Sequence, residues 1–309
     1  MILKKKLKIY IYPNARSHVQ DNMEKEYYNV VPLSEKGIED HCELVGPNEA
    51  EYYYMGQVSC GLPLPKKNEF KYFDGNKEKH IIDFEGDWFQ KSIPNWLRNS
   101  IVSVSGVKKE YEGIKIFTRP AVSSLLLDII RNNRRVRHTF ESNKNFCFKG
   151  FSDPHGIRVK MAKGCQLAGI KSNIIFNQAW HGKAHPRNKE VADYCKLMLQ
   201  NTFALCPSGT GVDSVRFFEA CFFSRIPVVI SDSFTMGKEF NKNKFFYFQI
   251  DPNNSISKIA EDLKEIEQTP LQKLEEMSYN SKEFFESKIR KYFEDPTLRF
   301  IEWLEKNEK

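Results

Sequence analysis

The chain lacks several patterns that would assign it to a familiar class at once. None of its seven cysteines belongs to a Cys-x-x-Cys pair, and several lie within apolar runs, where cysteine behaves as a small hydrophobic residue. An odd number of such cysteines argues against a zinc site and is typical of a reducing compartment. No run approaches the roughly 20 apolar residues of a membrane span, and no signal-type apolar segment follows the lysines at 4–6. We therefore expect a soluble, cytoplasmic protein.

The common phosphate-binding signatures are also missing. The first strand candidate is followed by YPNARSH, at residues 12–18, and not by the G-x-G-x-x-G of a dinucleotide-dependent oxidoreductase. No glycine-rich turn continues into Gly-Lys-Ser/Thr, which excludes a P-loop. The chain has no internal repeat and no low-complexity tract. These absences remove the commonest nucleotide-binding classes without excluding nucleotides as ligands.

What the sequence does contain is a basic, aromatic-rich composition. Its net charge is +7 and 13% of its residues are aromatic, enough to build a core and to favour anionic partners. A nucleic-acid-binding protein would explain the charge, but it needs aromatic residues interleaved with basic ones on an exposed face. Here the aromatic residues lie mostly in apolar strand and helix patterns, so we expect no nucleic-acid partner.

Strand and helix patterns alternate along the chain, which predicts βαβ units and a parallel sheet. We place a boundary near residues 141–144, which gives an N-terminal domain at 1–143, a second domain at 144–285 and a helical tail at 286–309. The second half has the plainer pattern. Strands are predicted there at 144–150, 172–177, 202–207, 226–232 and 244–251, and helices at 155–169, 188–201, 213–223 and 256–268.

A short turn between two apolar runs is the most informative stretch. The strand at 202–207 ends in Pro207, which cannot continue a ladder, and the Ser-Gly-Thr-Gly that follows permits positive φ. Asp213 or Ser214 can then cap the next helix. Because the N-terminus of a helix presents free N–H groups, this turn predicts an anion site such as one for a diphosphate.

Two charged residues follow on that helix. Arg216 lies in the first turn, where the helix dipole disfavours a cation by about 0.3–1 kcal/mol, and an anionic ligand would remove the objection. Glu219 is one turn further on, where a carboxylate could accept hydrogen bonds from ribose hydroxyls. We expect both beside a buried stripe formed by Val215, Phe218 and Phe222. The alternative is a surface ion pair between Arg216 and Glu219, worth a few tenths of a kcal/mol.

The same stretch resembles the signature of the exostosin-like glycosyltransferases, glycosyltransferase family 47. The shared pattern is Cys-Pro-x-Gly, then Ser-x-Arg-x-x-Glu-Ala, then an Ile-Pro-Val strand ending in Ser-Asp. The residues that carry it are Cys206, Pro207, Gly209, Ser214, Arg216, Glu219, Ala220, Ile226, Pro227, Val228, Ser231 and Asp232. The chain departs from the family at Ser224 and Arg225, where Gly-Cys is usual, and the geometry of the helix end is therefore in question.

Weaker matches extend the resemblance over most of the chain. The segment FCFKG…GIRVKM is similar to a Phe-x-Gly…Arg segment of the family, which assigns Gly150 and Arg158. The segment KHIIDFEGDW is similar to its Asp-His…His-Asp-x-Gly segment, with His80 matching and Asp87 near the second acid.

The resemblance implies an α/β fold of the GT-B type, with two Rossmann-like domains facing a cleft. It implies transfer of a sugar from a UDP-sugar to a hydroxyl of a glycan or glycoprotein acceptor, with inversion at the anomeric carbon. The donor-binding residues would be Gly150, Arg158, Pro207, Ser208, Gly209, Ser214, Arg216 and Glu219. The catalytic base would be Asp87 or, second, Glu85, because both follow an N-domain strand; His80 fits less well because it lies within that strand.

No metal or other cofactor is required by this interpretation. The chain contains no Asp-x-Asp, which a GT-A enzyme would use to hold a metal-bound diphosphate, and cationic side chains can replace the metal. A catalytically inactive sugar- or nucleotide-binding relative is the main alternative. The identity of the sugar is left open among xylose, glucuronic acid, galactose and N-acetylglucosamine.

Overall fold

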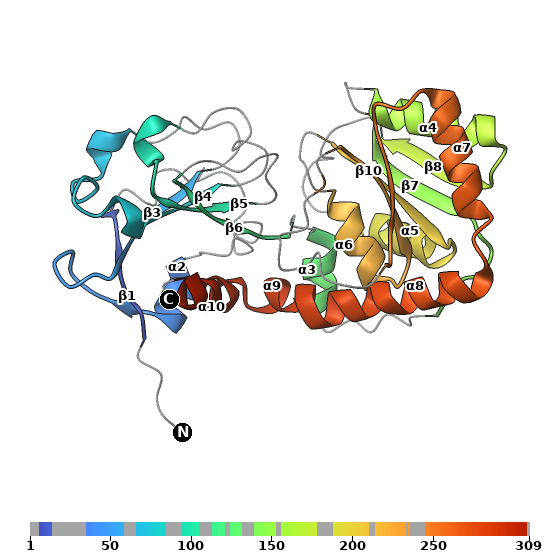
Figure 1. The fold of residues 1–309 in the computed structure, drawn as a ribbon. Coiled ribbons are helices and arrows are strands. Elements are labelled where there is room, and N and C mark those ends of the chain that lie inside the picture. Colours follow the sequence, from blue (N-terminus) through green and yellow to red (C-terminus); the bar gives the residue numbers. More distant parts are fainter. Residues whose placement is uncertain are drawn as a thin grey trace. The chain divides into compact units, whose positions relative to one another are not determined.

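The computed structural model describes residues 6–13, 35–58, 66–84, 94–104, 113–120, 124–131, 139–152, 156–177, 188–209, 214–232, 234 and 245–307. The chain divides into two compact units (Figure 1). The first comprises Met1–Val122 and Lys291–Lys309, and the second comprises Ser123–Arg290. The second unit thus starts before the boundary expected at 143, because it includes helix α3 (Ser124–Arg131). The expected tail at 286–309 is split between the two units. The second unit ends at Arg290, the first residue of helix α9 (Arg290–Glu294), and the rest of the tail belongs to the first unit.

The first unit is built on a six-stranded sheet in the order β2-β1-β3-β4-β5-β6, in which all pairs are parallel. The strands are β1 (Lys8–Ile11), β2 (Glu43–Leu44), β3 (Tyr52–Val58), β4 (His80–Phe84), β5 (Ile101–Val104) and β6 (Lys115–Thr118). Strands β4 and β5 are buried along their whole length, as is typical of parallel strands covered on both faces.

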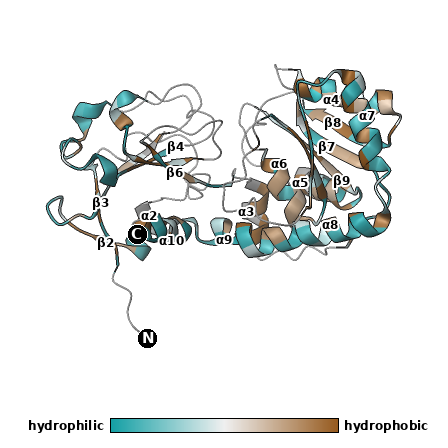
Figure 2. Ribbon diagram, in the orientation of Figure 1, coloured by the Kyte–Doolittle hydropathy of each residue, from teal (hydrophilic) through white to brown (hydrophobic). Residues whose placement is uncertain are grey.

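Short helices complete the first unit. Among the described residues these are α2 (Glu35–His41), the 3₁₀ helices η2 (Lys67–Glu69), η3 (Lys77–Lys79) and η5 (Asn95–Leu97), most of α9, and the longer α10 (Pro296–Asn307). Helix α10 packs against α2, and its Phe300 ring lies edge-on to Phe117 of β6. Helix α10 carries both hydrophilic and hydrophobic residues (Figure 2). Its buried residues Thr297, Phe300, Ile301 and Leu304 recur at the spacing expected of a helix with one buried face.

The second unit has a five-stranded parallel sheet in the order β11-β10-β9-β7-β8. The strands are β7 (Phe146–Phe151), β8 (Ser172–Asn177), β9 (Phe203–Pro207), β10 (Ile226–Ile230) and β11 (Phe248–Ile250). The chain runs from β7 outward to β8 and then returns to the other side of β7 to form β9. The strand order therefore reverses between β7 and β9, and ligands of open α/β sheets bind at the carboxyl ends of the strands flanking such a reversal.

Helices cover both faces of this sheet. Helices α4 (Ile157–Ala168) and α7 (Ile256–Glu267) bury Met161, Cys165, Ile259 and Leu263 against the β7, β9 and β10 side chains of one face. Helices α5 (Asn188–Leu199) and α6 (Val215–Phe222) lie on the other, where Cys147 Sγ contacts Met198 Sδ. Helix α8 (Leu271–Phe284) and the π-helix η6 (Phe285–Ile289) come after α7 in the chain, and both pack against α6.

The two residues that depart from the family pattern form the end of α6. Ser224 has a φ of 56°, the left-handed conformation in which glycine usually ends a helix. Arg225 is 1% exposed, and its guanidinium donates to four carbonyls, those of Phe223, Leu199, Asn201 and Thr139. The helix therefore ends with the usual backbone geometry, and Arg225 fastens that end to two other chain segments.

Candidate functional site

The predicted donor-site residues come together at the carboxyl ends of β7 and β9, where the strand order reverses. Gly150 lies near the end of β7, and Pro207, the last residue of β9, is followed by Ser208 and Gly209. The Ser208 N–H donates to the Ile230 carbonyl at 3.0 Å, which holds the start of the turn against the end of β10. The segment between Gly209 and Ser214 lies outside the described residues.

Helix α6 begins at this edge of the sheet. Its N-cap is Ser214, 7% exposed and in an extended conformation (φ −84°, ψ 126°), but within the described structure its hydroxyl makes no capping hydrogen bond. The alternative cap, Asp213, lies outside the described residues. Of the predicted buried stripe, Phe218 and Phe222 are buried but Val215 is only half-buried, while Phe217, Glu219, Ala220 and Cys221 are buried in addition. Helix α6 contacts β9, β10 and α8 and so is enclosed on more than one side.

Arg216 crosses the edge of the sheet. It starts on α6, and its guanidinium carbon lies 5.0 Å from the centre of the Phe148 ring, which belongs to the core on the opposite face. The Arg216 Nε–H donates to the Lys149 carbonyl at 2.6 Å. A Cβ atom at Gly150 would lie 2.5 Å from Arg216 Nη2. Glycine at position 150 therefore leaves the space through which the arginine passes.

Arg158 reaches the same ring from α4, which covers the face of the sheet opposite to α6. It lies in the first turn of α4, 9% exposed, with its guanidinium carbon 5.7 Å from the Phe148 ring centre. Its Nη1–H donates to the Phe151 carbonyl at 2.6 Å. A Cβ atom at Gly209 would lie 2.7 Å from Arg158 Nη2.

The sequence predicts only that the Ser-Gly-Thr-Gly turn permits positive φ, and Gly209 does not make use of that freedom. The described glycines with positive φ are Gly56, Gly113, Gly156 and Gly169, and Gly209 is not among them. What position 209 requires is the absence of a side chain, because Arg158 occupies that space.

Two guanidinium groups thus rest on one aromatic ring at the sheet edge. Each donates to a main-chain carbonyl of β7, and a hydrogen bond to a carbonyl holds the guanidinium in a fixed orientation. A guanidinium carries five N–H donors in a planar fork, which matches phosphate oxygens and makes short, charge-assisted hydrogen bonds to them. Together with the N-terminus of α6, this arrangement can bind a diphosphate.

Glu219 is hydrogen-bonded to Tyr194 and does not form, among the described residues, the surface ion pair with Arg216 that was the alternative expectation. Its carboxylate is 7% exposed, and Oε2 accepts a hydrogen bond of 2.5 Å from the hydroxyl of Tyr194 on α5. Burial, and then the negative charge of Glu219, raise the pKa of Tyr194 well above its usual value, while the charge of Arg216 opposes the rise. Guanidinium, carboxylate and phenol are therefore electrostatically coupled.

Sequence reasoning missed Tyr194. The residue sits at helical spacing with Val191, Leu197 and Met198, and the sequence pattern places all four in an apolar stripe on one face of the predicted helix at 188–201. A tyrosine in such a stripe carries a hydroxyl that needs a partner when buried, and that was the signal available. Its partner, 25 residues further along, could be identified only from the fold.

The predicted catalytic acids, Asp87 and Glu85, lie outside the described residues. Strand β4 ends just before them at Phe84, at the carboxyl edge of the first sheet. A different acid of β4 is described: Asp83 is fully buried, with Oδ1 3.6 Å from Nε of Arg119. Burial raises the pKa of Asp83, against the opposing charge of Arg119. Arg119 also donates from Nη2 to the Phe84 carbonyl at 3.0 Å.

His80 is a buried, structural histidine. Its Nδ1 is 2.7 Å from the Asn76 carbonyl, which can only accept, so the proton is on Nδ1. Nε2 then accepts from the Tyr12 hydroxyl at 2.9 Å. The ring stacks on Tyr53, and burial lowers the pKa of His80 to about 4. These contacts explain why a histidine stands at the start of β4 without assigning it a catalytic role.

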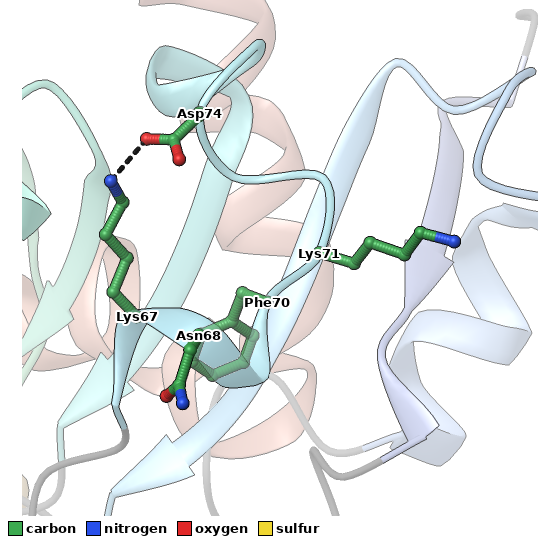
Figure 3. A pocket seen from close by; sticks show the side chains of 5 residues that line it. All are labelled: Lys67, Asn68, Phe70, Lys71 and Asp74. Carbon is green, nitrogen blue, oxygen red and sulfur yellow. Dashed lines mark ion pairs between the residues drawn. The ribbon is translucent and has the colours of Figure 1, made fainter.

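A shallow pocket of about 520 Å³ in the first unit shares no residue with the predicted donor site (Figure 3). It is lined by Lys67, Asn68, Phe70, Lys71 and Asp74. Lys67 pairs with Asp74 at 2.5 Å, which lowers the pKa of that carboxyl, while the Lys71 side chain extends away from this pair (Figure 3). The two lysines do not converge on one ligand position.

The helices in the described part of the chain include none that is long and apolar enough to cross a membrane. Over the same residues, no three His, Cys, Asp or Glu side chains gather as a possible set of metal ligands.

Solved structures resemble this chain in fold at low sequence identity. Sucrose-phosphate synthase from Thermosynechococcus elongatus has a TM-score of 0.50 and 9% identity over 97% of this chain and 99% of its own. A glycosyltransferase from Rickettsia africae has a TM-score of 0.42 and 11% identity over 98% of this chain and 100% of its own. S. aureus TarM, in complex with fondaparinux, alpha-GlcNAc-glycerol and UDP, has a TM-score of 0.41 and 10% identity, and covers 74% of this chain. This chain spans only 57% of the TarM structure.

The two parallel-sheet α/β units and the likeness to sucrose-phosphate synthase identify the fold class as GT-B, as expected from the sequence. No curated protein sequence matches the chain significantly. The family model of the Exostosin GT47 domain matches residues 95–257, more than half of the chain and the whole stretch that carries Gly150, Arg158, Gly209, Arg216 and Glu219. The chain therefore belongs to the exostosin GT47 family.

Proposed function

We propose that the chain is a glycosyltransferase that takes a sugar from a UDP-linked donor and transfers it, with inversion, to a hydroxyl of a glycan or glycoprotein. The observation that carries the proposal is the pair of guanidinium groups, Arg158 and Arg216, over the Phe148 ring at the strand-order reversal. A diphosphate is the group of a sugar nucleotide that two such cations and a helix N-terminus recognise. Family membership supports sugar transfer as the reaction.

The two arginines have a role in the chemical step as well as in binding. In a single displacement, the acceptor oxygen bonds to the anomeric carbon while the bond from that carbon to the diphosphate oxygen breaks. Negative charge then develops on the leaving diphosphate. Cations and N–H groups that are already oriented stabilise that charge without reorganising. The carbonyls of Lys149 and Phe151, which fix the two guanidinium groups, supply this orientation.

The acceptor hydroxyl must lose its proton during this step, which calls for a general base. We assign that role to Asp87, with Glu85 as the second candidate, because both follow the carboxyl end of β4 in the sequence. The strand order of the first sheet reverses between β1 and β3, next to β4. That is the position where the rule for open α/β sheets puts a ligand. We propose that no metal takes part, since the chain has no Asp-x-Asp and two arginines can meet the diphosphate.

UDP affinity of the purified chain tests the donor site. UDP should raise the melting temperature, and Arg216→Ala or Arg158→Ala should weaken binding by about tenfold or more, the value of a charge-assisted hydrogen bond. Arg290→Ala is the control, since that arginine of the same unit pairs with Glu286. Wild-type affinity in both site variants would show that the donor site is elsewhere.

Release of UDP from a panel of UDP-sugars, with and without glycan acceptors, then tests the reaction. Asp87→Asn should leave UDP affinity unchanged and remove transfer. Full activity in that variant would exclude Asp87 as the base. UDP binding without turnover on any donor would favour the inactive, sugar-nucleotide-binding alternative.

A further inference from the structure

The link between α5 and α6 assigns a role to a residue that neither the family signature nor the sequence pattern marks. Tyr194 of α5 and Glu219 of α6 meet at 2.5 Å through the phenol oxygen and Oε2. Glu219 is 7% exposed, and a buried carboxylate keeps its charge only when hydrogen bonds or cations compensate for the lost solvent. The contact is therefore more than incidental packing.

The direction of this hydrogen bond is fixed. Because burial and the Glu219 charge raise the pKa of Tyr194 well above its usual value, the phenol stays protonated at any ordinary pH and donates. The carboxylate can only accept. Tyr194 thus occupies one oxygen of Glu219 and restricts rotation of the carboxylate plane. A carboxylate on a flexible side chain loses rotamer freedom when it binds a ligand, and a carboxylate that is already held in place avoids that loss.

We propose that Tyr194 is a positioning residue for nucleotide recognition. Its hydroxyl holds the Glu219 carboxylate in the orientation in which that group accepts hydrogen bonds from the ribose hydroxyls of the donor. The inference rests on the proposed function, since it requires a ribonucleotide at this site. Arg216, three residues before Glu219 on the same helix, binds the diphosphate in that proposal, so phosphate and ribose contacts come from successive turns of α6.

A purely structural Tyr194 makes a different prediction. If the hydroxyl only braced α5 against α6, its removal would weaken every nucleotide equally or would lower stability alone. A positioning role instead acts on the ribose hydroxyls selectively. UDP and 2′,3′-dideoxy-UDP differ only in those hydroxyls, so the ratio of their dissociation constants isolates the contact.

The experiment is calorimetric titration of the full chain with both nucleotides. Wild-type protein should bind UDP more tightly than dideoxy-UDP by about tenfold or more, since hydrogen bonds to a charged group have that value. Tyr194→Phe should reduce the ratio by about fivefold or more, with dideoxy-UDP affinity unchanged. Tyr279→Phe, a 66% exposed tyrosine of α8 in the same unit, should keep the wild-type ratio. Glu219→Gln should reduce the ratio as Tyr194→Phe does, and the double variant should show little further loss.

A wild-type ratio in Tyr194→Phe, or equal weakening of both nucleotides, would overturn the inference. Should Tyr194→Phe fail to fold, Tyr194→Gln takes its place, because its amide retains an N–H donor. This variant should keep part of the preference for UDP over dideoxy-UDP. A ratio equal to that of the wild type, or a complete loss of the preference, would count against a positioning hydroxyl. Wild-type binding of UDP with no preference for ribose would overturn the inference and leave the diphosphate site standing. No binding of UDP by the wild type would overturn the proposed function itself.

Discussion

Arginine side chains lie at the carboxyl edge of both sheets, and their partners differ between the two units. In the first unit, Arg119 is 4% exposed and stands 3.6 Å from the buried carboxylate of Asp83. In the second, Arg158 and Arg216 share the Phe148 ring and donate to main-chain carbonyls. The comparison teaches that the partner of an arginine decides its role. An enclosed carboxylate makes it part of the fold, whereas in the proposed function the orienting carbonyls prepare it for an anion.

The largest effect that the comparison predicts is on the stability of the first unit. Arg119→Met leaves Asp83 as an uncompensated buried carboxyl, which should cost about 3–5 kcal/mol of the free energy of unfolding. Urea denaturation measures this loss, and UDP affinity of the folded protein should not change. Near wild-type stability combined with weaker UDP binding would break the comparison, because Arg119 would then behave like the arginines of the second unit.

The second effect is a pH dependence confined to the first unit. The pKa of His80 is about 4 in the folded protein and about 6.5 when unfolded, so the unfolded chain binds more protons between these values. Stability should therefore fall as pH is lowered from 6.5 to 4, by about 3 kcal/mol in total. His80→Gln should flatten this dependence in denaturation curves taken across that range. His41→Gln, a 28% exposed histidine paired with Asp295, is the control and should retain the dependence.

The smallest effect concerns the two glycines of the second unit. A methyl group at position 209 would lie 2.7 Å from Arg158 Nη2, and one at position 150 would lie 2.5 Å from Arg216 Nη2. Gly209→Ala and Gly150→Ala should displace the guanidinium groups and weaken UDP binding by about tenfold each, a typical loss for a misplaced charged hydrogen bond. Gly75→Ala, with no atom within 4 Å of the added carbon, should bind UDP normally. Unchanged affinity in the first two variants would mean that these guanidinium groups do not contact the nucleotide.

Local patterns predicted much of this architecture. Alternating apolar runs predicted the strands and helices of the second unit, and the Pro207 turn predicted where the chain approaches the sheet edge. The domain boundary depended on which unit α3 packs with, and β2, with two residues, is too short for a recognisable pattern. Ser224 takes the left-handed conformation although its side chain disfavours it, and the buried contacts of Arg225 that follow it link residues far apart in sequence.

The candidate site was predictable as a set of residue types but not as a geometry. Arg216 and Glu219 could be identified from the helix pattern and the family signature. That they face Lys149 and Tyr194 instead of each other depends on the packing of α6 against β9, from which Arg216 reaches β7 and Glu219 reaches α5. The contact of the Phe148 ring with the two guanidinium groups depends on the same packing. From the sequence, a phenylalanine in an apolar strand is predicted only to be a core residue. The geometry of the site is set by contacts between segments that are far apart in the chain, and local sequence patterns do not reveal which segments meet.

Phe148 connects residues from separate stretches of the chain, so that these residues depend on one another. Its ring supports Arg158 and Arg216, and each of these arginines in turn requires a glycine, at 209 and at 150. A change at any one of the five positions removes the reason for keeping the others. Under the proposed function, a lineage that gave up the anion site would be free to alter all five. Together these positions should then distinguish relatives that still bind a sugar nucleotide from those that have lost the ability.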